Sequence, residues 1–284
     1  MTTNRLHVAL ATCSTWPDLD EDGPALRQAL FQQRVDSTVA VWDDPTVDWA
    51  AFDLVLIRST WDWWDRHPDY LAWTRRVPRL ANSAAVVAWN TDKTYLRDLE
   101  RDGVPVVPTT WLEPGDVFTP PPSGTFVVKP TVSAGARDTA AYEPGDPAAA
   151  IHVDRLLAAG RMVMVQPYLE QVDTLGETSV LVFGGEVSHA AVKAAVLSPG
   201  AGTPALGSWR VSPRDASPLE VALALRVTAG RDLLYARVDL LPTADGPVLI
   251  ELEATEPSLF LRHAPGSALR LARAVRERAA RPVT

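Results

Sequence analysis

Two carboxylates lie one residue apart in the run VLIELEATEP, residues 248–257, which otherwise has the composition of a buried strand. In an extended chain alternate side chains share one face of the sheet, so Glu251 and Glu253 lie on the same side, roughly 6–7 Å apart. Like charges this close raise each other's pKa and destabilise the fold unless a cation or hydrogen bonds offset them. The pair therefore predicts a partner on that face.

The preceding run, LLYARVDLL at 233–241, has the same alternation and puts Asp239 on one face with Arg237. The turn signals of PTADGP join the two runs, which predicts a β-hairpin that brings Asp239 close to Glu251. Three carboxylates on one wall are hard oxygen ligands of the kind that Mg²⁺ or Mn²⁺ prefers. The alternative is a solvent-exposed sheet face with ordinary charges, and the hairpin alone does not decide between them.

Lysine is rare in this chain, because only three of its 27 basic residues are lysines: Lys93, Lys129 and Lys193. An ammonium is a compact point charge on a flexible stem, whereas a guanidinium is a planar fork. The three lysines are therefore candidates for sites that need a point charge, with chance retention as the alternative.

A small-residue loop follows Lys129, which ends the apolar run FVVK. Backbone N–H groups of Ser133, Ala134, Gly135 and Ala136 can approach an anion closely in such a loop. An ordinary hairpin turn is the alternative, because the loop has one glycine.

Charge and composition exclude several classes of protein. The net charge is −8 and the pI is near 5.2, which argues against general nucleic-acid or anionic-membrane binding. The single cysteine, Cys13, excludes internal disulfides and fits a reducing cytoplasm. No apolar run approaches the length of a membrane span, and the N-terminus lacks the apolar core of a signal peptide. We expect a soluble cytoplasmic protein, and a homodimer is compatible with the sequence.

Familiar catalytic motifs are absent as well. The sequence has no G-x-x-x-x-G-K-[ST] phosphate loop, no dinucleotide fingerprint, no G-x-S-x-G elbow and no zinc spacing among its five histidines.

The expected strands and helices follow two different patterns along the chain. Short apolar strands at 6–12, 37–42 and 53–59 alternate with helices at 23–33 and 68–77, which is typical of a parallel α/β unit. Asn90 is expected to cap a helix over 91–102 that Gly103 ends. From residue 125 onward strands predominate, at 125–130, 161–169, 178–185 and 186–195, with helices at 146–160, 217–230 and 266–280. Nine of the ten tryptophans precede residue 112, and we interpret most of them as core and domain-contact residues.

The order of these parts resembles the ATP-grasp superfamily of ligases, in particular its glutathione-synthetase-like members, over nearly the whole chain. The resemblance implies that Lys93 of NTDKTYL and Lys129 with its loop bind the ATP phosphates. It assigns VQPYL to the adenine hinge, and Glu177 of LGETSV to the ribose, although the spacer before that glutamate is slightly longer than in those relatives. The nucleotide-binding residues implied in this way are Lys93, Lys129, Ser133, Gly135, Ala136, Gln166, Tyr168, Leu169 and Glu177.

The same resemblance implies Mg²⁺ at Asp239, Glu251 and Glu253, with Mn²⁺ as the other candidate. Many relatives carry asparagine where this chain has Glu253, and the glutamate keeps an oxygen ligand and adds a negative charge.

The resemblance also implies a layout of three domains. The N-terminal α/β domain at 1–89 lies on the substrate side, a central ATP-grasp subdomain at 90–168 lies over the phosphates, and a C-terminal subdomain at 169–284 contains the metal-binding strands. The Gly-, Pro- and Ser-rich residues 198–213 are expected to form a lid.

ATP-grasp enzymes typically phosphorylate a carboxylate and let an amine attack the acyl phosphate. The resemblance thus implies a small amino-acid-like carboxylate substrate, and Lys193 falls where relatives place a basic residue at the γ-phosphate or substrate. Arg58 ends an N-terminal strand, where such sheets place ligands, and its fork can grip a carboxylate. Arg210 and Arg237 are the other candidates, and an internal salt bridge is the alternative for each arginine.

Within the superfamily the segments CSTWPDLDEDG, IRSTWDWWDRHPDYLAW and WNTDKTYL are similar to a bacterial subgroup, the O-ureido-D-serine cyclo-ligases of D-cycloserine synthesis. This similarity implies ring closure within one amino-acid substrate, and so a role in antibiotic biosynthesis. Three alternatives stay open: an intermolecular carboxylate–amine ligase, an ATP-grasp phosphotransferase, and a nucleotide-binding protein without turnover.

Overall fold

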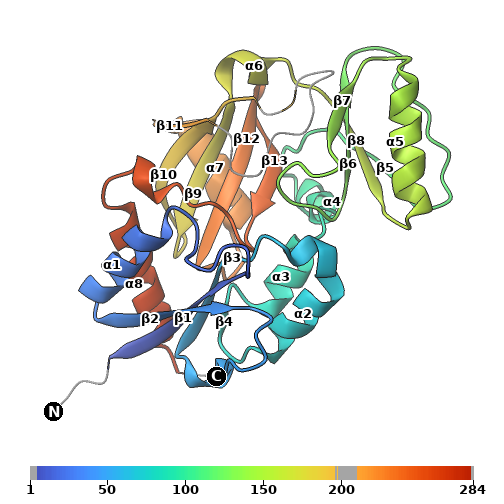
Figure 1. Ribbon diagram of the computed structural model, residues 1–284. Coiled ribbons are helices and arrows are strands. Elements are labelled where there is room, and N and C mark those ends of the chain that lie inside the picture. Colours follow the sequence, from blue (N-terminus) through green and yellow to red (C-terminus); the bar gives the residue numbers. More distant parts are fainter. Residues whose placement is uncertain (1–4, 196, 198–209, 283–284) are drawn as a thin grey trace.

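Three sheets follow one another along the chain in a computed structural model that describes residues 5–195, 197 and 210–282 (Figure 1). The first sheet is parallel, and the second and third are antiparallel. The predicted fold class, a parallel α/β unit followed by two α+β units, is confirmed. None of the helices in the described ranges combines the length and apolarity that a transmembrane span needs.

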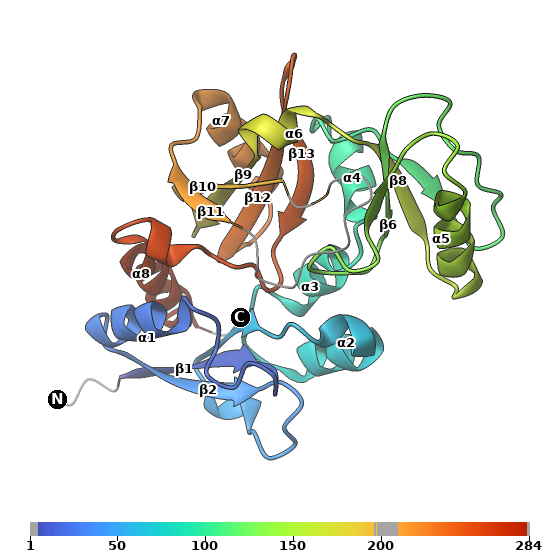
Figure 2. The same cartoon turned by 45° about the horizontal axis from the view of Figure 1, so that its top comes forward.

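The N-terminal sheet has the strand order β2-β1-β3-β4, with β1 at Leu6–Thr12, β2 at Val35–Val41, β3 at Leu54–Ser59 and β4 at Leu80–Ala81. Helix α1 (Gly23–Gln32) connects β1 to β2, and α2 (His67–Arg76) connects β3 to β4. Figures 1 and 2 show α1 and α8 (Ser267–Ala279) on one side of this sheet, and α2 with α3 (Ala84–Asn90) on the other. The short strand β4 and helix α3 were not predicted.

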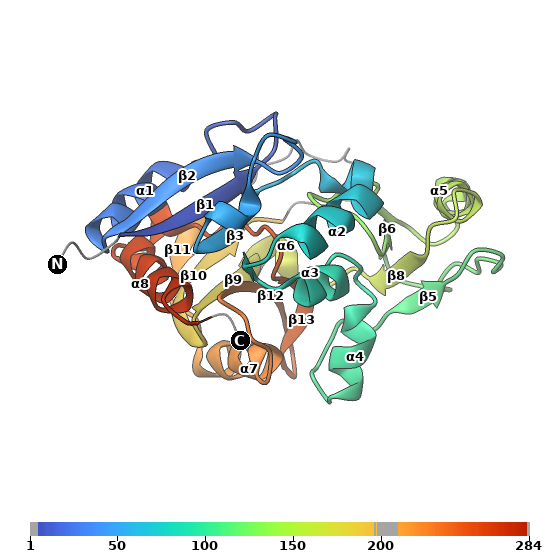
Figure 3. The same cartoon turned by 90° about the horizontal axis from the view of Figure 1, so that it is seen from below.

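The second sheet has the order β5-β8-β6-β7 and is covered by helix α5 (Pro147–Ala158). Its strands are β5 at Thr110–Leu112, β6 at Phe126–Pro130, β7 at Ala140–Tyr142 and β8 at Val163–Pro167. Seen from below, this unit extends away from the other two sheets, with α5 at its outer edge (Figure 3).

The third sheet has the order β11-β10-β9-β12-β13. Its strands are β9 at Glu177–Phe183, β10 at Glu186–Lys193, β11 at Val211–Arg214, β12 at Tyr235–Thr243 and β13 at Gly246–Glu253. The predicted hairpin is confirmed: β12 and β13 are antiparallel, and Asp239 pairs with Glu251. Helix α7 (Pro218–Thr228) starts with a capping box, in which Ser217 and Glu220 satisfy each other's backbone N–H groups.

Two apolar cores hold the three units together. One contains residues of β1, β3, β9 and α8, such as Leu10, Leu56, Leu181 and Leu271, and joins the first sheet to the third. The other places Leu96 of α4 (Tyr95–Arg101) against β12, β13 and α7. Shorter elements complete the described chain: α6 at Gln171–Leu175 and 3₁₀ turns at Trp49–Ala51, Trp63–Arg66 and Leu261–His263.

Two predictions need correction. Asn90 does not cap the helix after it, because it is the last residue of α3, and α4 starts at Tyr95. Its buried side chain instead donates to the Leu252 carbonyl and accepts from the Ala254 N–H, each at 2.7 Å. The predicted lid lies outside the described residues over 198–209, and residues 211–213 belong to the edge strand β11 rather than to a loop.

Candidate active site

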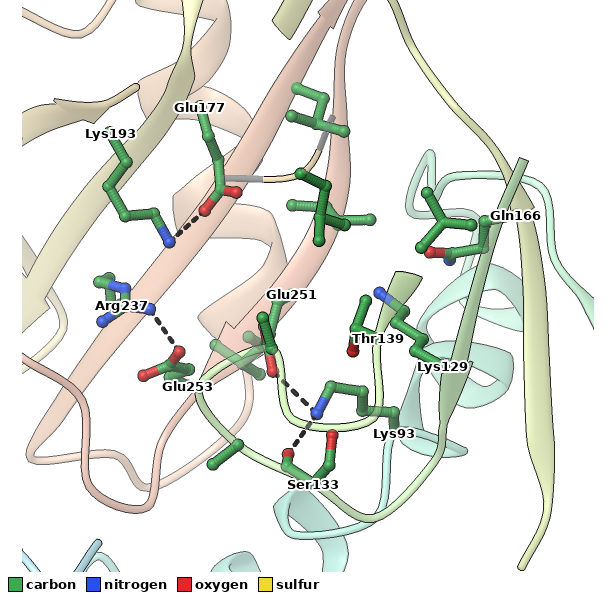
Figure 4. Close-up of a pocket in the computed structure, with 18 of the residues that line it drawn as sticks. Lys93, Lys129, Ser133, Thr139, Gln166, Glu177, Lys193, Arg237, Glu251 and Glu253 are labelled. Carbon is green, nitrogen blue, oxygen red and sulfur yellow. Dashed lines mark hydrogen bonds and ion pairs between the residues drawn. The ribbon is translucent and has the colours of Figure 1, made fainter. Parts of the chain in front are cut away.

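A cavity of about 230 Å³ lies between the second and third sheets, and all three lysines of the chain line it. Lys93 precedes α4, Lys129 lies in β6 and Lys193 ends β10, so three separate elements supply the ammonium groups. Each lysine is more than nine-tenths buried. Figure 4 shows these lysines together with four acidic and basic side chains of the third sheet. Buried ammonium groups require anionic partners, which here are carboxylates of the cavity or an anion bound in it.

The acidic wall consists of Asp239, Glu251 and Glu253 from the β12–β13 hairpin. One carboxylate oxygen from each lies within 4.8 Å of the other two. Asp239 is fully buried, while the other two side chains are about 30 % exposed to the cavity. Three convergent carboxylates form a hard oxygen donor set that fits a divalent cation such as Mg²⁺.

Each of these carboxylates also has a cationic partner, which offsets the repulsion between like charges that the sequence analysis expected. Lys93 Nζ lies 3.1 Å from Glu251, and Arg237 Nη2 lies 2.8 Å from Asp239 and also pairs with Glu253. Although burial alone would raise the pKa of Asp239, Arg237 and Lys193 hold that pKa well below its usual value. Burial dominates at Glu253 and raises its pKa to about 7.

Lys193 connects this wall to Glu177, the first residue of β9. Its ammonium lies 2.9 Å from Asp239 and pairs with Glu177 as well. Burial would lower the pKa of Lys193, yet the two carboxylates raise it above the usual value. Burial raises the pKa of Glu177 to about 7. Lys193 therefore stays charged at neutral pH, beside a carboxyl group that titrates near neutrality.

The small-residue loop after β6 closes another side of the cavity. Ser133, Gly135 and Ala136 line it, and Gly135 and Ala136 are consecutive residues in the left-handed region, with φ of 63° and 58°. Lys93 Nζ donates to the Ser133 carbonyl at 2.7 Å, which ties the loop to the acidic wall. Burial lowers the pKa of the neighbouring Lys129 to about 8. The loop, Lys93 and Lys129 thus line the same cavity.

The opposite end of the cavity is apolar. Tyr168 and Leu169, which follow β8, line it together with side chains that the sequence analysis did not single out: Val127, Val172, Leu241 and Ile250. Gln166 also lines the cavity and donates to Thr109 Oγ1 at 2.8 Å. A slot of apolar side chains beside a backbone hinge suits a flat aromatic base.

Two predicted arginines do not line the cavity. Arg58 is 1 % exposed, and its Nη2 lies 3.4 Å from Asp20 and donates to the Pro257 carbonyl at 3.2 Å. Arg210 is exposed, and its carbonyl accepts from the Ala194 N–H. The salt-bridge alternative therefore describes the contacts of Arg58, and its predicted contact with a substrate stays untested.

Sequence reasoning missed a group at the end of the cavity nearest the N-terminal domain, namely Trp61, Trp63 and Glu256. Glu256 is the third acid of the run VLIELEATEP, residues 248–257, so its proximity to Glu253 was a usable signal. The tryptophans were assigned only to cores and domain contacts.

Comparisons with known proteins agree with this architecture. A family model described as the N-terminal domain of D-cycloserine synthetase DcsG matches residues 8–82. The chain is 39 % identical over 295 residues to the cycloserine biosynthesis protein DcsG of Streptomyces lavendulae, covering 95 % of this chain and 98 % of that protein. The crystal structure of D-cycloserine synthetase DcsG matches with a TM-score of 0.87 and 36 % identity, over 96 % of this chain and 99 % of that chain. The ATP complex of D-alanine–D-alanine ligase from Bacillus anthracis shares the fold, with a TM-score of 0.67 and 13 % identity over 96 % and 97 % of the two chains.

Proposed function

This chain belongs to the DcsG family of ATP-grasp ligases, and from that premise we propose that it uses ATP and Mg²⁺ to close a ring within a small amino acid. The observation that carries the proposal is that the only three lysines of the sequence line a single cavity together with Glu251 and Glu253, whose carboxylates converge with that of the buried Asp239. ATP-dependent C–N bond formation requires this combination, because negative phosphates must be bound and neutralised while charge is transferred.

In this proposal ATP lies along the cavity from the apolar slot to the acidic wall. Tyr168 and Leu169 contact the base, Glu177 binds the ribose, and Lys93 and Lys129 bind the phosphates under residues 133–136. The burial of both ammonium groups supports these roles, since a buried point charge interacts strongly with phosphate oxygens. Apart from Gln166, these are the nucleotide-binding residues that the sequence resemblance implied.

Asp239, Glu251 and Glu253 would hold the metal ion, which would offset negative charge on the transferring phosphoryl group. Lys193 and Arg237 both pair with Asp239, which raises the pKa of each, so both stay positively charged next to the acidic wall. We therefore assign them to the γ-phosphate and to the carboxylate of the substrate.

The proposed reaction has two steps. A substrate carboxylate oxygen attacks the γ-phosphorus, giving an acyl phosphate and ADP. A nitrogen of the same substrate then attacks the carbonyl carbon, loses its proton and expels phosphate. With O-ureido-D-serine, attack by the nitrogen bonded to oxygen closes a five-membered ring, and hydrolysis of the carbamoyl group by one water then gives cycloserine and carbamic acid.

The test measures ADP release and chemical trapping. ATP, Mg²⁺ and O-ureido-D-serine should release ADP without any added amine. O-Methyl-D-serine has the carboxylate but no internal nucleophile, and with hydroxylamine it should yield a hydroxamate through the trapped acyl phosphate. ADP release from O-ureido-D-serine accompanied by a stable phosphorylated product would instead identify a phosphotransferase. ATP binding without stimulated ADP release for any amino acid or small carboxylate would identify a protein without turnover.

A further inference from the structure

Glu256 is a buried carboxylate in the cavity wall that has no cationic partner. It follows β13 by three residues and is 8 % exposed. Of the acids that line the cavity in the described part of the chain, Glu177, Glu251 and Glu253 each pair with a lysine or arginine, and Glu256 forms no ion pair. A desolvated carboxylate without a cation is costly, so this position requires an explanation.

Two indoles from the N-terminal domain hold Glu256 in place. Trp63 Nε1 donates to Glu256 Oε1 at 2.5 Å, and Trp61 Nε1 donates to the Glu256 carbonyl at 3.0 Å. These contacts join residues 193 and 195 positions apart in the sequence. Both tryptophans also line the cavity, so the carboxylate is fixed in orientation and bordered by aromatic surface.

The indole N–H groups are neutral donors, and Lys93 favours the charged form of Glu256 through space without forming an ion pair with it, so among the described residues no cation contacts the carboxylate. Burial accordingly raises the pKa of Glu256 to about 7. A carboxylate beside aromatic rings is a receptor for a cation, because the ring faces also attract positive charge. ATP is an anion and cannot supply that cation, and the convergent carboxylate group for a metal lies elsewhere in the cavity, at Asp239, Glu251 and Glu253.

We propose that Glu256, held by Trp61 and Trp63, binds the α-ammonium group of the amino-acid substrate and makes the enzyme selective for α-amino acids over the corresponding deamino acids. This inference rests on the proposed function. In an α-amino acid the ammonium and the carboxylate are separated by one carbon. Glu256 and Arg237 line the same cavity, so an anion site and a cation site are open to one amino-acid substrate.

The test compares two substrates and two variants. O-Ureido-D-serine carries the ammonium group, and 3-(ureidooxy)propanoic acid is the same molecule without it. Glu256→Gln retains an acceptor for Trp63 and removes the charge, while Glu186→Gln, at an exposed position of β10, is the matched control. We expect Glu256→Gln to lower kcat/KM for O-ureido-D-serine by roughly 10- to 100-fold, the range for a lost hydrogen bond to a charged group. Turnover of the deamino acid and the KM for ATP should stay within about twofold of wild type.

The outcomes separate this inference from the proposed function. Equal losses for both substrates would mean that Glu256 only supports the fold, and would overturn the assignment alone. Calorimetric titration of both compounds in the presence of a non-hydrolysable ATP analogue provides the second measurement. If wild type neither releases ADP with O-ureido-D-serine nor binds it, the proposed function fails and the ammonium site fails with it.

Discussion

Lys93 and Glu251 form an ion pair of 3.1 Å that connects the segment before α4 to strand β13. The same ammonium donates to the Ser133 carbonyl at 2.7 Å. Although burial would raise the pKa of Glu251, Lys93 and Lys129 lower it below the usual value, so Glu251 is ionised at neutral pH. One carboxylate thus contacts Lys93 and, through that lysine, the small-residue loop, and it belongs to the group of three carboxylates to which we assign the metal ion.

Glu251→Gln should abolish ADP formation while the protein stays folded. The amide has the volume of the carboxyl group but lacks the charge that a divalent cation requires of its ligand. The measurement is a coupled ADP assay together with thermal unfolding, and Glu186→Gln on the exposed part of β10 should keep wild-type turnover. Near-normal activity of Glu251→Gln would remove this residue from the metal site.

Lys129→Arg should also be severely impaired in ATP affinity and rate. A planar guanidinium does not fit a buried position under the loop of residues 133–136 that holds a point charge. Arg137→Lys, the reverse exchange at a neighbouring half-exposed arginine, is the control and should have little effect. Retained affinity and turnover in Lys129→Arg would show that Lys129 does not contact phosphate.

ATP affinity should fall as the pH rises through about 8, the pKa to which burial lowers Lys129. The ammonium form binds phosphate, and ATP binding stabilises that form, so binding near this pH takes up a proton. Below pH 7 the lysine is already protonated, and the dependence through this group should level off. Calorimetry in buffers of different ionisation enthalpy measures the proton uptake, which should be lost in Lys129→Met. An affinity for ATP that is constant from pH 7 to 9.5 would exclude this titration.

Asn90→Ala should weaken metal binding as well as stability. Its amide satisfies the Leu252 carbonyl and the Ala254 N–H, on both sides of Glu253, and each group left unpaired in the interior costs about 1–3 kcal/mol. Ser267→Ala is the control, since the buried Ser267 hydroxyl donates to the Leu261 carbonyl at 2.9 Å and neither residue lines the cavity. Chemical unfolding should show a loss for both variants, and Mg²⁺ titration of activity should show a higher requirement for Asn90→Ala only. The same Mg²⁺ requirement in both variants would leave Asn90 a purely structural role.

Local pattern was sufficient to predict the hairpin itself, because both runs alternate and turn residues join them. It did not predict the β-bulge between Asp239 and Leu240, which shifts the register set by the turn and brings Asp239 opposite Glu251. The rarity of lysine singled out Lys93, Lys129 and Lys193, and the resemblance to ATP-grasp ligases placed them in one site, which agrees with the single cavity that they line. Pattern failed at Asn90, whose tertiary hydrogen bonds to β13 outcompete helix capping. It missed Glu256, whose significance depends on tryptophans about 190 residues earlier in the chain, a contact that no local spacing reports.

Product analysis of a reaction with one organic substrate tests the central claim most directly. Wild-type enzyme with ATP, Mg²⁺ and O-ureido-D-serine, and no other amine, should release ADP and phosphate and form a product with the mass and retention of cycloserine. Ammonia from the carbamoyl group should appear in equal amount to ADP. An absolute requirement for a separate amine, with a linear amide as the product, would contradict ring closure and leave an intermolecular ligase.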